Sequence, residues 1–109
     1  MTTEYIRLAK TDEITDGRVK VYQAHGKRVA VCNVKGTYYA VADLCTHDGG
    51  PLGEGELVDH QIECPRHGAR FDIETGKVMC LPAVLPIATY KVEERNGELW
   101  VSVPETVTS

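Results

Sequence analysis

The sequence predicts an all-β fold, an antiparallel β-sandwich or barrel that carries one loop-rich insert. Short alternating or β-branched stretches, with turn residues about every ten positions, fill the first forty or so residues and return after Pro86. Between them, from Cys45 to Gly76, lie six of the ten glycines, with few apolar residues and no helical period. A chain of 109 residues suggests one domain, so we expect a single domain over 1–109 with the insert at about 43–86.

The N-terminal strands follow from periodicity. Residues 18–22 alternate polar and apolar side chains, which is the pattern of a half-buried strand. Residues 28–34 form a short β-branched run, and 37–42 form a third stretch of the same kind. Turns are expected at 24–27 and 35–36, which makes this region a meander of short strands.

The insert has little strand character. Within it, 61–64 and 70–72 are the pieces that could form strands. A stretch this long without regular structure is uncommon in a small domain unless it is functional. We therefore expect something other than a hydrophobic core to order it.

A C-terminal hairpin is expected after Pro86. Residues 87–93 and 99–103 are strand-like, and Asn96-Gly97 between them is a strong signal for a tight hairpin turn. Pro104 ends the second strand, and 105–109 are expected to fray.

Composition narrows the functional classes. The net charge of −4 and the pI near 5.5 disfavour a nucleic-acid binder, which usually shows a basic patch. No apolar run approaches the roughly 20 residues needed to span a bilayer, and no secretory signal is visible at the N-terminus. We expect a cytoplasmic protein with no nucleic-acid or membrane partner. Its cysteines are then more readily metal ligands or free thiols than disulfides.

Two Cys-His pairs in the insert carry the chemistry. Cys45-Thr46-His47 is followed, after sixteen intervening residues, by Cys64-Pro65-Arg66-His67. Each pair has a glycine one or two residues beyond its histidine. Such a foursome arises rarely by chance, so we take Cys45, His47, Cys64 and His67 as candidate metal ligands.

The ligand set leaves two kinds of metal site open. Two thiolates and two imidazoles could hold a tetrahedral zinc ion. Zinc sites of that kind usually group Cys with Cys and His with His along the chain, whereas here each loop supplies one of each. That arrangement suits a binuclear centre in which one metal takes both sulfurs and its neighbour both nitrogens, as in Rieske [2Fe–2S] centres.

The stretch from Cys45 to Asp72 resembles the paired cluster-binding loops of the Rieske family. Residues 76–78, followed by Pro82-Ala83 and Pro86, resemble the proline-containing third loop that covers the cluster in that family. The resemblance implies a Rieske-like β-sandwich or barrel with a cluster-binding subdomain and one [2Fe–2S] cluster per chain. It also implies that Cys45 and Cys64 bind the inner iron and that His47 and His67 bind the outer one.

This chain differs from the family's high-potential members at positions that affect the reduction potential. Those members join the loops by a disulfide, but the matching positions here are Gly50 and Arg66. They also place hydroxyl donors where this chain has Ala69 and Phe71. Imidazole ligands raise the potential above that of all-Cys clusters, and losing the hydroxyl donors lowers it again. We expect a value toward the low end of the Rieske range of about −150 to +300 mV.

By size, the chain is most similar to the small Rieske ferredoxins. This implies a one-electron carrier and not an enzyme. It would take electrons from an NAD(P)H-dependent flavin reductase and pass them to a terminal non-haem iron oxygenase, with transient contacts near His47 and His67. Three alternatives stay open: a small subunit of an assimilatory nitrite reductase, an accessory to iron–sulfur assembly, and a zinc-binding interaction module.

The other two cysteines and two histidines are not expected to bind the metal. Cys32 is expected to be a buried thiol, Cys80 to lie in the proline-containing loop, His25 to be a turn residue and His60 to be a solvated loop residue. Acidic residues cluster near the proposed ligands, as either a solvated face or a docking surface for a basic partner. They are Asp48, Glu54, Glu56, Asp59 and Glu63.

Overall fold

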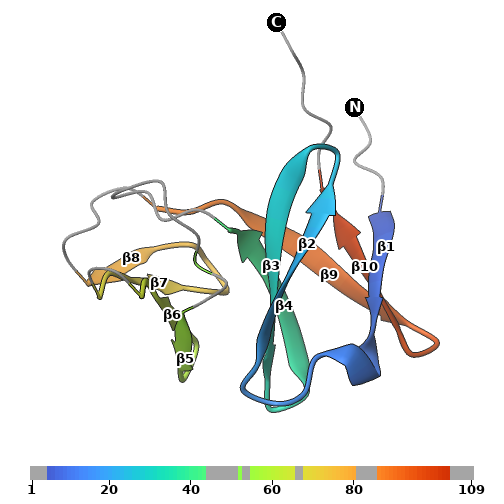
Figure 1. Ribbon diagram of the computed structural model, residues 1–109, viewed down its shortest axis with the longest axis horizontal. Helices are drawn as coiled ribbons and strands as arrows, with labels where there is room; N and C mark the ends of the chain where they lie inside the picture. Colours follow the sequence, from blue (N-terminus) through green and yellow to red (C-terminus); the bar gives the residue numbers. More distant parts are fainter. Residues whose placement is uncertain (1–4, 44–51, 53–54, 66–67, 81–85, 104–109) are drawn as a thin grey trace, which may run out of the picture.

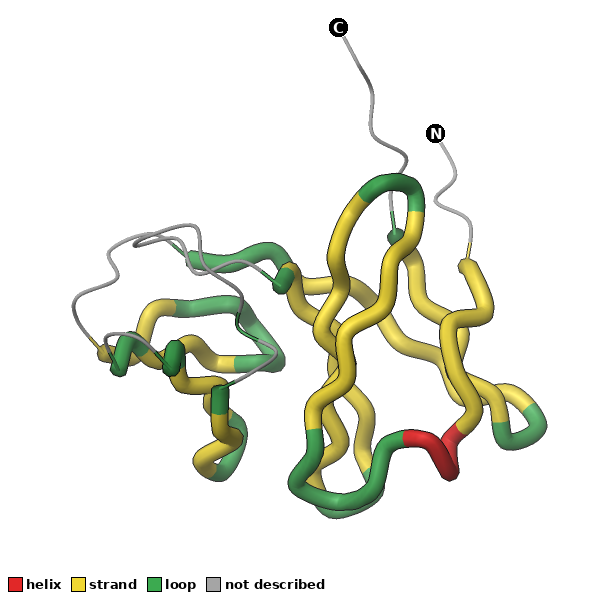
Figure 2. The backbone as a smooth tube through the Cα atoms, viewed as in Figure 1, coloured by secondary structure: helices red, strands yellow, loops and turns green. Residues whose placement is uncertain are grey.

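The computed structural model describes residues 5–43, 52, 55–65, 68–80 and 86–103, and these are almost entirely β-structure (Figures 1 and 2). One short 3-10 helix, η1 (Thr11–Glu13), follows the first strand. The strands are β1 (Tyr5–Lys10), β2 (Val19–Ala24), β3 (Lys27–Val34), β4 (Thr37–Ala42), β5 (Glu56–Val58), β6 (Gln61–Glu63), β7 (Arg70–Asp72), β8 (Val78–Cys80), β9 (Thr89–Arg95) and β10 (Glu98–Ser102).

Six strands form the larger sheet, in the order β1-β10-β9-β4-β3-β2. Every neighbouring pair in it is antiparallel. The edge strands β1 and β2 approach each other, so the sheet curls into a near-barrel (Figure 1). The predicted all-β fold is confirmed.

Two-residue turns fix the register of the hairpins. Asn96 and Gly97 between β9 and β10 both have positive φ, 48° and 77°. His25 and Gly26 between β2 and β3 have φ of 50° and 75°. Positive φ at both central positions marks the type I′ turn, whose twist matches that of antiparallel strands. Both turns lie where the sequence predicts them.

The smaller sheet contains β5-β6-β7-β8, again all antiparallel, and lies beside the near-barrel (Figure 1). Along the chain it falls between β4 and β9, which are themselves paired through Ala40↔Tyr90 and Val41↔Thr89. Just beyond this pairing the Ala42 N–H donates to the Ala88 carbonyl at 2.9 Å. The chain therefore leaves and re-enters the near-barrel at adjacent points.

Apolar side chains form two cores. One lies in the near-barrel and is built from β1, β2, β3, β4 and β10 with flanking residues; its buried members are Ala9, Ile14, Ala24, Val29, Val31, Ala40, Leu99, Val101 and Val103. The other joins the opposite side of β3 and β4 to the smaller sheet; its buried members are Ala30, Cys32, Val34, Val41, Leu52, Ile62, Cys64, Ala69, Phe71, Ile73 and Ile87. The second core is what attaches the insert.

Element boundaries differ modestly from expectation. β9 begins at Thr89 and not at residue 87, because residues 86–88 connect the insert to the sheet before strand pairing starts. β5 and β8 are strands that the sequence analysis does not expect; they form at the two edges of the smaller sheet, by pairing with β6 and β7. The expected fraying of 105–109 lies outside the described residues, and the single domain over 1–109 stays a prediction. In the part of the chain that the structure describes, no helix is long and apolar enough to cross a membrane.

Candidate metal centre

One of the four predicted ligands lies among the described residues. Cys64 directly follows β6, is a free thiol and is 1 % exposed. Cys45, His47 and His67 lie outside the described residues, as do Gly50 and Arg66. Within the described ranges, no three His, Cys, Asp or Glu side chains gather to hold a metal ion. The structure therefore places one predicted ligand, and the ligand role of all four residues stays a prediction.

Backbone hydrogen bonds close the loop that begins at Cys64. The Cys64 N–H donates to the Ala69 carbonyl at 2.7 Å, and the Gly68 N–H donates to the Cys64 carbonyl at 3.0 Å. Gly68 has φ of 76°, a conformation that side chains with a Cβ rarely adopt. The adjoining Glu63–Arg70 ion pair, at 2.8 Å, bridges β6 and β7. These contacts fix Cys64 at the end of β6.

The ends of the stretch that contains Cys45 and His47 meet at Asp43 and Leu52. The Leu52 N–H donates to Asp43 Oδ1 at 2.8 Å, and Arg28 Nη2 lies 2.8 Å from Asp43 Oδ2. The Asp43 N–H also donates to the Arg28 carbonyl at 3.0 Å. Leu52 is fully buried in the core that attaches the insert. Residues 43 and 52 are therefore held together as the base of this stretch.

The proline-containing stretch has a similar base. The Gly76 N–H donates to the Asp72 carbonyl at 2.7 Å, and the Ile87 N–H donates to the Gly76 carbonyl at 2.9 Å. Gly76 has φ of 81°, and a Cβ there would collide with the Ile87 carbonyl oxygen. Cys80 closes β8 by pairing with Arg70, so the expectation that it lies in a loop is wrong: the β7–β8 ladder extends to it.

The chemistry around Cys64 fits an iron–sulfur ligand. Its thiol lies in an apolar core with Ile62 and Phe71, and soft thiolate donors are the ligands that iron–sulfur clusters require. Ala69 and Phe71 are fully buried, and neither carries a hydroxyl that could donate to a cluster sulfur. The surroundings therefore exclude water from the thiol.

Cys32 differs from Cys64. It lies in β3, where burial raises the pKa of its thiol to about 12, so it stays protonated near neutral pH. A protonated thiol is a poor metal ligand. The expectation of a buried thiol is confirmed.

The two histidines that are not expected to bind metal lie in turns, as the sequence indicates. His25 lies in the β2–β3 turn. His60 is an exposed turn residue whose ring meets Tyr39 edge-on, with ring centroids 5.8 Å apart.

The expected acidic face is partly described. Glu56 and Asp59 are exposed, whereas Glu63 pairs with Arg70. Asp48 and Glu54 lie outside the described residues. Two solvent-facing carboxylates therefore remain as candidates for a docking surface.

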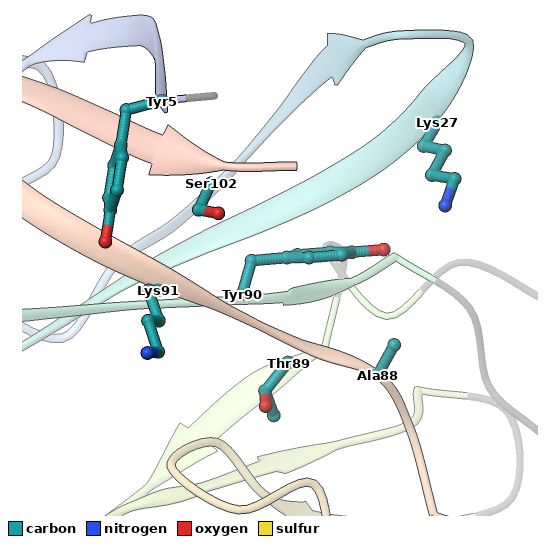
Figure 3. A pocket seen from close by; sticks show the side chains of 7 residues that line it. All are labelled: Tyr5, Lys27, Ala88, Thr89, Tyr90, Lys91 and Ser102. Atoms are coloured by element: carbon teal, nitrogen blue, oxygen red, sulfur yellow. The ribbon is translucent and has the colours of Figure 1, made fainter. Parts of the chain in front are cut away.

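An open hollow of about 490 Å³ lies on the near-barrel, and Figure 3 shows the Tyr90 side chain extending across it toward Lys27. Its lining residues are Tyr5, Lys27, Ala88, Thr89, Tyr90, Lys91 and Ser102. Phenol, hydroxyl and ammonium groups do not supply the thiolate and imidazole donors of the predicted centre. This hollow is therefore not the metal site.

Comparison with known proteins decides the family. The profile of the Rieske [2Fe-2S] domain matches residues 4–91. The chain belongs to the Rieske [2Fe-2S] family. It is 41 % identical over 96 residues to the ferredoxin component of the naphthalene 1,2-dioxygenase/salicylate 5-hydroxylase systems of Ralstonia sp., covering 88 % of this chain and 92 % of that protein. It is 38 % identical to the naphthalene 1,2-dioxygenase ferredoxin component of Pseudomonas putida, covering 94 % and 99 %.

Solved structures agree with this Rieske assignment. The ferredoxin of carbazole 1,9a-dioxygenase from Nocardioides aromaticivorans IC177 superposes with a TM-score of 0.88 at 33 % identity, covering 93 % of this chain and 98 % of that one. A ferredoxin in a complex of reduced oxygenase and oxidised ferredoxin of carbazole 1,9a-dioxygenase gives 0.88 at 29 % identity, covering 98 % and 100 %. The predicted family is confirmed, and with it a Rieske [2Fe–2S] cluster as the cofactor.

Sequence reasoning did not single out the residues that close the loops. Asp43 and Arg28 are far apart in the sequence, so nothing in a periodicity pattern joins them. The clue that the sequence offers to these residues is their place along the chain. Asp43 stands two residues before the first predicted ligand, and Gly76 is the first residue of the third loop.

Proposed function

We propose that this Rieske domain is the one-electron carrier of an oxygenase system. It accepts electrons from an NAD(P)H-dependent flavin reductase and delivers them to a terminal non-haem iron oxygenase. The observation that carries the proposal is the extent of the likeness. The chain matches 92–99 % of the length of dioxygenase ferredoxin components, but 32 % of a terminal oxygenase, at 23 % identity and with the same fold.

The proposed ligands are Cys45 and Cys64 for one iron and His47 and His67 for the other. When bound, the cluster supplies a site that gains and loses one electron. The chain's own contribution is to fix Cys64 at the end of β6, to exclude water with Ile62 and Phe71, and to hold the loop bases in place.

Ala69 and Phe71 support a low reduction potential. With two imidazole ligands the oxidised centre is formally neutral, which makes reduction easier than in an all-Cys cluster. Without hydroxyl donors at these two positions, the extra negative charge of the reduced state is less stabilised. We expect a midpoint toward the low end of about −150 to +300 mV. A redox titration checks it, and a midpoint near the upper end would contradict the assignment.

The proposed partners approach transiently near His47 and His67, in the cytoplasm. The exposed carboxylates of Glu56 and Asp59 support a basic docking partner, because complementary charge accelerates encounter. If so, electron transfer to the reductase or oxygenase slows as ionic strength rises, since salt screens exposed charges. Stopped-flow rates at several salt concentrations test this, with Glu56→Gln/Asp59→Asn expected to flatten the dependence.

The deciding experiment compares two buried cysteines. Wild-type protein, Cys64→Ser and Cys32→Ser are purified anaerobically and assayed for iron, sulfide and the EPR spectrum after dithionite reduction. Wild type and Cys32→Ser should show a rhombic Rieske-type signal, and Cys64→Ser should lose it. Stoichiometric zinc with no EPR signal in the wild type would overturn the proposal, as would a retained cluster in Cys64→Ser.

A further inference from the structure

We propose that Asp43 is a positioning residue for the first cluster-binding loop. Its buried carboxylate, held by Arg28, ties residue 43 to residue 52, which flank the stretch that carries the proposed ligands Cys45 and His47. This inference rests on the proposed function, because it takes those two residues as cluster ligands.

Each oxygen of the Asp43 carboxylate faces a different partner. Oδ1 accepts the Leu52 N–H at 2.8 Å, and Oδ2 lies 2.8 Å from Arg28 Nη2. The Asp43 side chain is 0 % exposed while that of Arg28 is 55 % exposed. The carboxylate therefore reaches inward to the loop base, and the arginine neutralises it from the surface.

The end of the β3–β4 ladder does not need the Asp43 carboxylate. The β3–β4 ladder ends at Val29↔Ala42, and the Asp43 N–H already bonds the Arg28 carbonyl. The backbone thus completes the strand end without any side chain. Burying a charged carboxylate costs free energy unless it is paired and hydrogen-bonded. Here Arg28 supplies the opposite charge, and the hydrogen bond comes from Leu52, at the far end of the loop. This makes the loop base the structural purpose of the side chain.

The first loop differs from the other two in what closes it. Among the described contacts, the second is closed by backbone bonds between Cys64 and residues 68–69, and the third by the Gly76–Ile87 backbone bond. The contact that joins the ends of 44–51 uses a side chain. A substitution of Asp43 therefore removes the hydrogen bond between the two ends of the first loop directly.

Graded substitutions separate the two contacts. Asp43→Ala removes both, and Asp43→Asn keeps an oxygen for the Leu52 N–H but loses the charge. Arg28→Met removes the charge partner from the surface side. Residues that hold metal ligands in place typically contribute about 10- to 100-fold to metal affinity. We expect cluster loss in the presence of a chelator to quicken by about that factor in Asp43→Ala, with smaller increases in the other two.

A structural role alone would not change the cluster's spectrum, so the EPR g-values of the reduced protein are measured alongside. Asp43→Ala and Asp43→Asn should shift or broaden them. The matched control is Asn33→Ala. Asn33 is also a buried polar residue, donating to the Ile14 carbonyl at 2.7 Å and accepting the Gly36 N–H at 2.9 Å, but it serves the β3–β4 turn. It should lower the unfolding temperature and leave the g-values and the cluster-loss rate as in wild type.

The outcomes distinguish this inference from the proposed function. A Cys45→Ser protein that lacks the cluster, together with unchanged kinetics and g-values in Asp43→Asn and Arg28→Met, would overturn the positioning role alone. A cluster retained in Cys45→Ser would remove the ligand assignment itself. If Asp43→Ala does not accumulate, the Asp43→Asn and Arg28→Met proteins decide, because each keeps part of the contact.

Discussion

Two buried thiols in one apolar core illustrate how local surroundings divide a residue type into different roles. Cys32 lies within β3, with its backbone engaged in the ladders to β2 and β4. Cys64 lies where a strand ends and a loop begins. A loop end can turn a sulfur toward a metal, whereas a strand interior holds it inside the core.

Cys32 should make the protein less stable in alkali. Its thiol pKa is raised from 9.0 to about 12 in the folded state. Above pH 9 the unfolded chain loses this proton and the folded chain keeps it, so stability present below pH 9 is lost as pH rises, at up to about 1.4 kcal/mol per pH unit. The unfolding temperature, measured by circular dichroism from pH 8 to 10, should fall more steeply for wild type than for Cys32→Ala.

The range from pH 8 to 10 stays below the pH at which a second group, the Tyr22 hydroxyl, affects stability. Burial and the bond to Glu13 raise the pKa of Tyr22 from 10.0 to about 12, so its contribution is lost above pH 10. Equal slopes for wild type and Cys32→Ala below pH 10 would contradict the assignment of the alkaline loss to Cys32.

A histidine-to-cysteine substitution tests the proposed outer ligands. His67→Cys replaces a neutral imidazole by a thiolate, which adds negative charge to the centre and should lower the midpoint potential, if iron is retained. Protein-film voltammetry measures the shift. A midpoint identical to that of wild type would show that His67 is not a ligand, and His60→Cys, at an exposed turn position, serves as the control.

At the scale of elements, hydrogen bonds hold together the residues that flank each of the three proposed loops. At the Gly76–Ile87 contact the two backbones meet with no room for a side chain. Gly76→Ala should therefore destabilise the fold by about 3 kcal/mol, combining collision with a left-handed backbone.

Gly17→Ala is the matched control for that substitution. Gly17 also has a positive φ, 80°, but nothing lies within 4 Å of where its Cβ would be. It should cost about 1 kcal/mol, from backbone strain alone. Chemical denaturation followed by fluorescence gives both values, and equal losses would mean that the approach to Ile87 carries no penalty.

Elements with a clear period could be predicted from the sequence, and contacts between distant residues could not. The strand at 37–42 and the Asn96-Gly97 turn match the structure because each depends on local chemistry. β5 and β8 were not predicted, because they form by pairing with β6 and β7, a contact that no local pattern shows. The Cys-His motifs identified the family by their spacing. The Arg28–Asp43 pair could not be foreseen, because the fold brings it together.

At the scale of the whole molecule, the two cores differ in what holds them. The near-barrel core lies within six strands of five to eight residues. The smaller sheet has four strands of three residues each, the short end of the usual range, and its buried side chains pack against β3 and β4. The insert therefore needs its attachment core and, by the proposed function, the cluster.

Removing the cluster should loosen the insert more than the near-barrel. Metal binding and folding are coupled where ligands come from loops, so apo-protein should exchange the amides of 56–80 faster than holo-protein does. The amides of β2, β3 and β4 should keep their protection. Hydrogen exchange followed by mass spectrometry measures both regions. A uniform acceleration over the whole chain would show instead that the cluster stabilises the near-barrel as much as the insert.

The hydrogen bond between Ala42 and Ala88 has an evolutionary consequence. Because the chain leaves the near-barrel at Ala42 and returns at Ala88, which are hydrogen-bonded to each other, β4 and β9 would still pair if a tight turn replaced everything between them. The pairing of β4 with β9 thus does not depend on the length of the insert, whereas the apolar face of β3 and β4 that packs against the insert depends on being covered by it. Insertions or deletions in the insert should therefore be tolerated where they leave Leu52, Ile62 and Phe71 packed against β3 and β4.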